Sequence, residues 1–285
     1  MKRQMRTYYY AIFGAIGGLA GWQVSNLLGL SFIRSIYLSE AIVGALVGLG
    51  IGLLIGVVEG VLTRNFVQVL KSGGFNCLLG AAAGAIGLPL SEFLFQSVGA
   101  GIIGRLLGWG IFGLLLGLAQ GVTGKSQAWK GALGGLLGGV FGGLLLESAQ
   151  SLLEDQLLGK MAGLVLLGAS TGAFISLIVT LLSRAWIEVT SGKLKGSEFI
   201  LDKFLAKGHP AIAIGSSALK SEIVFPDPDI APQHALLTGD GAHFTIKDIS
   251  LSGTFINKRR IEQAELANRQ TIRMGNTEMV YYEKR

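Results

Sequence analysis

The stretch GALGGLLGGVFGGLLL, residues 131–146, places glycines at four-residue intervals in two parallel series and carries no charged side chain. Four-residue spacing stacks side chains along one face of an α-helix. With its apolar flanks the stretch approaches the length of about 20 residues that a bilayer-spanning helix needs. It therefore predicts a glycine-faced transmembrane helix, and similar stretches occur through residues 1–190.

Composition divides the 285-residue chain into two parts. Of its 44 glycines, 36 lie in residues 1–190, whereas 24 of its 42 charged side chains lie in residues 191–285. The mean hydropathy is +0.55 and 15% of residues are charged, against about 25% in a typical soluble domain. These values exclude a disordered chain and disfavour an ordinary cytosolic enzyme. We predict a transmembrane helical domain at 1–188 and a cytoplasmic β-domain at 189–285.

Six apolar stretches are long enough to span a bilayer, at residues 8–30, 41–62, 74–95, 99–122, 129–147 and 161–182. Positive charge gathers at the N-terminus and in alternate connections, which carry Arg64, Lys71, Lys125 and Lys130. Because Lys and Arg are retained on the cytoplasmic side, this bias orients the spans. It predicts six spans in a bacterial inner (cytoplasmic) membrane, with both termini in the cytoplasm.

A repeat with a period near 60 residues relates the spans, because Arg64, Lys125 and Arg184 each follow an apolar span. We interpret it as three two-span hairpins in the same orientation. Glycine faces mark close helix packing, which in lipid replaces the missing hydrophobic force. Two such faces consist of Gly44, Gly48, Gly52, Gly56 and Gly60, and of Gly131, Gly135, Gly139 and Gly143. Their spacing leaves open whether they pack within one chain or join a homo- or hetero-oligomer.

Few ionisable side chains lie inside the spans, so each is a functional candidate. Glu59 lies near the cytoplasmic end of the second span. Glu92 and Arg105 lie at similar depth near the opposite end, where they could pair with each other. Structural ion pairing and a hydrated transport route both remain open for these residues.

Residues 191–285 contain short strand-like runs separated by turn sequences such as Pro226–Asp229 and Thr238–Gly241. The runs are Glu198–Leu201, Ala211–Ile214, Glu222–Phe225, His234–Leu237, Ala242–Ile246, Gly253–Ile256, Thr271–Arg273 and Glu278–Tyr282. Short strands at near-regular spacing predict an all-β sandwich.

Motifs follow one another in this tail in a specific order. Ile214-Gly215-Ser216 is followed by APQHA at 231–235, Asp248-Ile249, SGTFIN at 252–257 and Met274-Gly275. This order and spacing resemble the forkhead-associated (FHA) domain family across roughly residues 197–283. The resemblance implies an FHA-like sandwich that binds phosphothreonine peptides through loops at one end.

The resemblance also implies roles for single residues. Scaffold roles fall to Gly215, His234 and Gly253, and partner contacts to Ser216, Ser217, Lys220, Ser252, Thr254 and Asn257. At the positions where the family contacts phosphate, this chain carries different residues. Ser216 stands in place of the family's arginine, Ala231 in place of its serine and Ser252 in place of its first asparagine. Neutral hydroxyl donors contribute only about 1 kcal/mol each, and a lysine lacks the guanidinium fork. Phosphothreonine recognition and a phosphate-independent protein surface therefore both remain open.

No sequence pattern indicates an enzyme, a metal site, a cofactor or nucleic-acid binding. We therefore expect an integral membrane adaptor or scaffold, in which a glycine-zipper bundle in the lipid bilayer presents an FHA-like domain to a cytoplasmic protein partner. Phosphopeptide binding in a signalling context follows from the resemblance alone. The alternative is a subunit of a channel, transporter or secretion complex that is regulated through its FHA-like domain.

Overall fold

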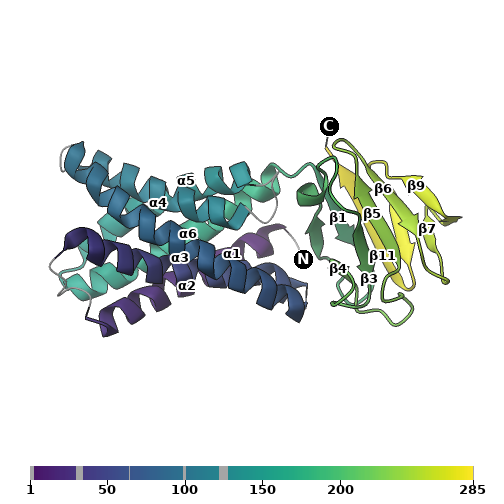
Figure 1. Cartoon of the computed structure of the whole chain (residues 1–285), viewed down its shortest axis with the longest axis horizontal. Helices are drawn as coiled ribbons and strands as arrows, with labels where there is room; N and C mark the ends of the chain where they lie inside the picture. The colour runs from purple at the N-terminus through teal and green to yellow at the C-terminus, as the bar shows by residue number, and fades with distance from the viewer. Residues whose placement is uncertain (1–2, 30–34, 64, 99–100, 122–127, 285) are drawn as a thin grey trace. The chain divides into compact units, whose positions relative to one another are not determined.

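A computed structural model describes residues 3–29, 35–63, 65–98, 101–121 and 128–284, so Arg64 and Lys125 of the predicted repeat lie outside the described residues. Contacts divide the chain into two compact units. One contains the helical segments Gln4–Glu59 and Val69–Leu181, and the other contains Leu182–Arg285 together with the short segments Met1–Arg3 and Gly60–Gln68. Figure 1 draws the helices in purple to teal and the strands in green to yellow.

The described part of the chain contains six α-helices, which confirms the predicted helix count. They are α1 (Arg3–Leu27), α2 (Ile36–Leu62), α3 (Phe66–Ser97), α4 (Ile102–Gly121), α5 (Ala128–Leu152) and α6 (Gln156–Leu181). Helices α2 to α6 are long and apolar enough to cross a membrane, and α1 is not among them. Two arginines and three tyrosines in its first turns lower the hydropathy of α1.

Three helix interfaces repeat one contact, in which a glycine of one helix lies against a main-chain carbonyl group of another. A β-carbon added to the glycine would collide with the carbonyl oxygen, so only glycine permits the approach. The pairs are Gly84 with Gly44 between α3 and α2, Gly139 with Trp109 between α5 and α4, and Gly18 with Leu164 between α1 and α6.

The other three interfaces, within the predicted hairpins, also repeat one contact. Here a glycine of the first helix lies against the α-carbon of a larger residue in the second. The pairs are Gly21 with Val47, Gly87 with Phe112, and Gly138 with Thr171. Each helix therefore packs on the next, and α6 packs on α1, in a closed ring built from three similar hairpins.

Helices α2, α4 and α6 supply the apolar filling of this ring. Ile51, Phe112, Leu116 and Leu167 are the largest of their fully buried side chains, together with Ile55. A polar contact also crosses the ring, because the Gln120 side chain of α4 donates to the Gly52 carbonyl of α2 at 3.2 Å. The even-numbered helices thus form an inner core, as a three-hairpin repeat requires.

The predicted glycine faces lie against neighbouring helices of the same chain. This holds for Gly44, Gly48, Gly52, Gly56, Gly131, Gly135, Gly139 and Gly143. Gly60 instead lies at the end of α2, where its carbonyl accepts the Asn65 N–H at 2.8 Å. The faces are therefore filled within one chain and are not free to join an oligomer.

Glu59 joins α2 to the first turns of α1. Its carboxylate forms an ion pair with Arg6 and accepts the Tyr10 hydroxyl at 2.9 Å. The guanidinium of Arg6 also lies over the Tyr10 ring. These contacts give Glu59 a structural role.

The second unit is a β-sandwich with a short 3₁₀ helix at Asp202–Phe204. Its strands are β1 (Ala185–Val189), β2 (Glu198–Ile200), β3 (Ile212–Gly215), β4 (Ile223–Val224), β5 (Ala235–Gly239), β6 (Phe244–Asp248), β7 (Thr254–Ile256), β8 (Arg259–Ile261), β9 (Gln263–Glu265), β10 (Thr271–Met274) and β11 (Thr277–Glu283). One sheet has the order β2-β1-β11-β10-β7-β8 and the other β4-β3-β5-β6-β9. All pairs are antiparallel except β3 with β4.

Strand β1 begins upstream of the boundary predicted at residue 189. It pairs with β11 from Ala185↔Glu283 to Val189↔Met279, and with β2 on its other side. The buried carboxylate of Asp202 accepts the main-chain N–H groups of Arg184 and Ala185 at 2.8–3.1 Å. The sandwich therefore incorporates the chain almost directly after α6 ends.

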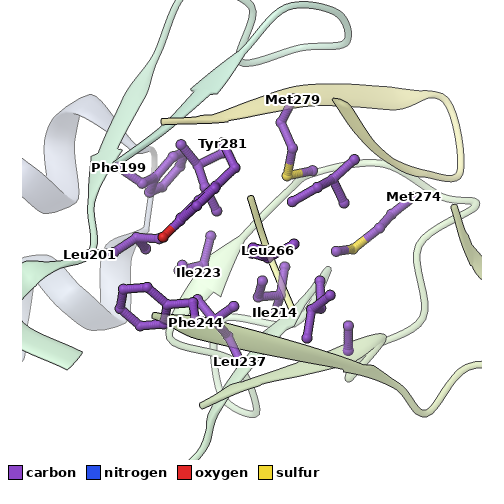
Figure 2. Packing of buried hydrophobic residues seen from close by; sticks show 14 of the residues in the cluster. Phe199, Leu201, Ile214, Ile223, Leu237, Phe244, Leu266, Met274, Met279 and Tyr281 are labelled. Atoms are coloured by element: carbon purple, nitrogen blue, oxygen red, sulfur yellow. The ribbon is translucent and has the colours of Figure 1, made fainter. Parts of the chain in front are cut away.

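The sandwich core lies between the two sheets (Figure 2). Ile214 and Leu237 of one sheet and Met279 and Tyr281 of the other are almost completely buried. The Tyr281 hydroxyl donates to the Glu283 carboxylate at 3.0 Å. Burial and that neighbouring carboxylate raise the pKa of Tyr281, so its phenol stays neutral in the core.

Replacing Gly135 by alanine tests the glycine contacts of the bundle. A β-carbon there would collide with the Gly113 carbonyl oxygen and the backbone at Gly117, whereas Gly74 has nothing within 4 Å. We expect Gly135→Ala to lower stability by about 1–3 kcal/mol, as overpacking does. Thermal unfolding of the full chain in detergent measures the effect, with Gly74→Ala as the matched control. Equal melting temperatures for the two variants would contradict the tight approach of α4 and α5.

Candidate functional site

Three loops meet at one edge of the sandwich, namely β3–β4 (216–222), β4–β5 (225–234) and β6–β7 (249–253). The Ser216 N–H donates to the Ala231 carbonyl at 3.0 Å, which joins the first loop to the second. The Ser252 hydroxyl donates to the Asp229 carbonyl at 3.4 Å, which joins the third loop to the second. This edge brings Ser216, Ser217 and Ser252 together, as predicted from the sequence.

His234 braces these loops from inside. Its side chain is fully buried. Nδ1 accepts the Ala231 N–H at 3.2 Å, and Nε2 lies 3.2 Å from both the Gly253 carbonyl oxygen and the Ser250 hydroxyl. Because a main-chain N–H can only donate, Nδ1 must accept and Nε2 carries the proton. One imidazole thus fixes two loops relative to each other.

Asp248 anchors the β6–β7 loop. Its Oδ1 accepts the Ser250 N–H at 3.1 Å, the Ser250 hydroxyl at 2.8 Å and the Thr254 hydroxyl at 3.0 Å. Partial burial disfavours the charged carboxylate, but the hydrogen bonds from Ser250 and Thr254 outweigh it and lower the pKa of Asp248. The loop is therefore held by an ionised carboxylate.

Two glycines permit close approaches at the same edge. A β-carbon on Gly215 would collide with the Pro232 carbonyl oxygen. Gly253 adopts a left-handed φ of 85°, and the Arg260 side chain lies across it. The Arg260 guanidinium donates to the Leu251 carbonyl at 3.3 Å. Both glycines, like His234, thus occupy the scaffold positions implied by the sequence resemblance.

The residues predicted to contact a partner differ in accessibility. Ser216 and Ser217 are half-buried, whereas Lys220 and Ser252 are exposed at the loop edge. Thr254 is fully buried and its hydroxyl donates to Asp248, so its predicted partner contact is wrong. The sequence motif alone could not distinguish a hydroxyl that is accessible on a loop from one that is buried in the sandwich.

Asn257 also serves the scaffold. It lies in the β7–β8 turn with a left-handed φ of 47°. Its side-chain oxygen accepts the Thr271 N–H at 3.1 Å, and its own N–H donates to the Thr271 carbonyl at 2.9 Å. Asn257 therefore links the β7–β8 turn to β10. This turn follows β7, whereas the 249–253 loop precedes it.

The β4–β5 loop has a second anchor that the sequence analysis missed. Asp227 is buried and accepts the Thr277 hydroxyl at 2.9 Å and the Asn276 N–H at 3.0 Å, which fixes the loop to the β10–β11 turn. The adjacent Asp229 carboxylate accepts the Asn276 side-chain amide. The sequence Pro226–Asp229 indicated a turn, but nothing in it indicated the partner of either carboxylate.

The loop edge offers neutral hydroxyls, the exposed Lys220 and the Arg260 guanidinium that lies across Gly253, but it lacks the family's arginine and the family's serine at the two positions where they contact phosphate. Ser216 and Ala231 occupy these positions and are adjacent in space through their main-chain hydrogen bond. Among the described residues, no group of three or more His, Cys, Asp or Glu side chains is arranged to hold a metal ion. The edge is therefore suited to hydrogen bonding and shape recognition.

Known proteins share the C-terminal part of the chain. Residues 212–275 match the family model of the FHA domain. The glycogen accumulation regulator GarA of Mycolicibacterium smegmatis is 30% identical over 98 residues, which are 34% of this chain and 58% of that protein. GarA of Mycobacterium tuberculosis is 28% identical over 100 residues, 34% of this chain and 56% of the relative. The chain thus spans little more than half the length of these relatives.

A solved structure also resembles this region. The FHA domain of the CT664 protein from Chlamydia trachomatis is 27% identical. The alignment covers 36% of this chain and 100% of that domain, with a TM-score of 0.32.

Replacing Asp248 by alanine tests the loop anchor. Because its pKa is lowered on folding, the carboxylate stabilises the sandwich above its unfolded value of about 3.9 and loses that effect as pH falls through the folded value. Three lost hydrogen bonds should cost about 1–3 kcal/mol at pH 7. Urea unfolding of residues 182–285, which carry their own core, measures it.

The difference between wild type and Asp248→Ala should begin to shrink as the pH falls below about 3.9, where the unfolded carboxylate is protonated, and should go on shrinking through the lowered pKa of the folded Asp248. Glu262→Gln changes only an exposed side chain and keeps the main-chain carbonyl that accepts the Asp248 N–H at 2.8 Å, so it serves as the control and should unfold like wild type. A difference that stays constant from pH 7 down through this acid range would argue against the charged anchor.

Proposed function

We propose that this chain, whose C-terminal sandwich is an FHA domain, is a membrane-embedded adaptor. Its helical bundle anchors in a bacterial cytoplasmic membrane, and its three-loop edge binds a cytoplasmic protein partner. The observation that carries the proposal is the preserved bracing of that edge by His234, which orders both loops around exposed hydrogen-bonding groups. The chain acts by binding and not by catalysis.

Membrane anchoring is supported by the apolar length of the helices. Five of them meet the length and composition of membrane spans. The bias of Lys and Arg toward the N-terminus and alternate connections supports a cytoplasmic location for both termini, and therefore for the FHA domain. The curated relatives named as regulators support a regulatory, non-enzymatic role for that domain.

Partner recognition should not depend on an arginine–phosphate ion pair. FHA domains imply phosphothreonine recognition, but a dianionic phosphate needs charge-assisted donors to offset its desolvation. Ser216 supplies a neutral hydroxyl where a guanidinium would form two parallel bonds, and Ala231 supplies none. We therefore propose recognition of a protein surface through hydrogen bonds at the loop edge, with little preference for phosphate.

Site-specific photo-crosslinking of the full chain tests where the partner binds. A photoreactive amino acid at Ser217 lies on the three-loop edge, and one at Asp240 lies in the β5–β6 turn at the other end of β5. We expect a defined crosslinked protein from position 217 that is absent from position 240. The same set of products from both positions, or none from 217, would contradict a partner-binding edge.

Restoring the two missing side chains tests the account of phosphate. We expect the wild-type chain to bind phosphothreonine and unphosphorylated peptides within about threefold of each other. Ser216→Arg combined with Ala231→Ser should raise the preference for phosphothreonine at least tenfold, since it adds a charge-assisted pair of about 1.5–3 kcal/mol. Calorimetric titration of degenerate peptide libraries into the full chain in nanodiscs measures both. Phosphate-dependent micromolar binding by the wild type would overturn the proposed mode.

A further inference from the structure

A cavity of about 500 Å³ lies at the end of the bundle that carries the α1–α2, α3–α4 and α5–α6 connections. All six helices line it. Apolar side chains deeper along the helices, including Val47, Leu88 and Leu146, close it below. Phe112 and Leu167, which are completely buried, fill the ring beyond them. The lining residues thus describe a pocket at one end of the bundle.

The threefold repeat of the ring identifies equivalent positions in this cavity. The contacts of Gly84 with Gly44, Gly139 with Trp109, and Gly18 with Leu164 are equivalent. Eight residues after each glycine lie Glu92, Glu147 and Asn26. The residues that these glycines contact are Gly44, Trp109 and Leu164. Four residues before them lie Glu40, Arg105 and Lys160, respectively. All six side chains line the cavity, so each of the three interfaces contributes one matched pair.

The matched pair of the α4–α5 interface is satisfied within the chain. Arg105 and Glu147 form an ion pair, and the Arg105 guanidinium also lies 4.9 Å from the centre of the Phe95 ring. The sequence analysis had paired Arg105 with Glu92, which is wrong. The sequence predicted how far along its helix Arg105 lies, but it did not predict that the side chain faces α5.

The equivalent pair of the α2–α3 interface consists of two carboxylates. Glu40 and Glu92 repel each other, and Lys160 attracts Glu40 from across the cavity. Among the described residues, Glu40 has no ion pair, and Glu92 accepts only the Gln96 amide at 2.8 Å. Among the described residues that line the cavity, three carboxylates (Glu40, Glu92 and Glu147) lie with two cationic side chains, Arg105 and Lys160.

We propose that Glu40 and Glu92 bind the ammonium or guanidinium group of a small organic cation. The bound cationic group lies between the two carboxylates. Its position corresponds to that of the Arg105 guanidinium beside Glu147 at the α4–α5 interface. The repeat itself supplies the comparison, because the backbone position equivalent to Glu40 carries a cationic side chain, Arg105 or Lys160, in both of its other copies.

The cavity determines the class of ligand. No group of three or more metal-ligating side chains is found among the described residues, which disfavours a metal ion. Trp22 and Trp109 are also among the lining residues, and aromatic side chains attract organic cations. Its volume accommodates a small molecule and not a peptide. The ammonium can come from a soluble amine or from the ethanolamine headgroup of a lipid.

Calorimetric titration of the full chain tests the site. The protein is held in phosphatidylglycerol nanodiscs, which contain no ammonium headgroup, and the probes are ethylguanidinium, ethylammonium and the neutral 1-propanol. We expect the cations to bind and 1-propanol not to bind. Glu40→Gln and Glu92→Gln should each weaken cation binding at least tenfold, whereas Glu154→Gln, which lies in the α5–α6 connection outside the cavity, should leave it unchanged. Equal binding of cations and 1-propanol, or unchanged binding in both Glu→Gln variants, would overturn the proposal.

A second variant copies the satisfied interface. Glu40→Arg should pair with Glu92 as Arg105 pairs with Glu147, which abolishes cation binding and raises the melting temperature. Wild-type cation affinity in this variant would also overturn the proposal. Replacing half of the lipid with phosphatidylethanolamine distinguishes the sources. A weaker apparent affinity for ethylguanidinium assigns the site to the lipid headgroup, and an unchanged affinity assigns it to a soluble amine.

Discussion

Close approach of helix backbones at glycine is the interaction on which the helical bundle depends. Between two helices in lipid there is little hydrophobic force, so packing must come from dispersion over short distances. Gly44 and Gly84 provide that approach at one interface, and equivalent contacts recur at two others. Because each contact tolerates no β-carbon, it fixes both the spacing and the register of its helices. The placement of every charged side chain at the cavity end follows from that register.

In the sandwich, one buried polar side chain has the corresponding role. His234 satisfies both ring nitrogens with groups from two loops, and Asp248 holds the second of these loops from its other side. These contacts involve the main-chain N–H of Ala231 but not the side chain of Ser216 or Ala231. The shape of the loop edge is therefore independent of the side chains that would bind phosphate, so an FHA domain can exchange its ligand chemistry without losing its loop scaffold.

Sequence patterns predicted the elements whose signal is local. Six helices and most of the strands between Glu198 and Tyr282 follow from hydropathy, alternation and turn residues. Strand β1 was missed because it follows an apolar helix directly, and its Trp186 ring stacks on Tyr282 of β11. Strands β8 and β9 are three residues long and mostly polar, so they carry no strand signal. A hydropathy profile also does not show which way a side chain faces around its helix axis. That direction decides the partner of Arg105.

The repeat explains how a nearly symmetric ring comes to contain an asymmetric pocket. Three identical pairs would give either three neutral ion pairs or three clusters of like charge, and neither arrangement selects one interface for binding. This chain varies the pair while the glycine contacts beneath it stay the same. One interface holds Arg105 with Glu147, one holds Lys160 with Asn26, and one holds two carboxylates. The varied charges distinguish the three interfaces at the cavity, and the proposed cation site lies at the interface that carries two carboxylates.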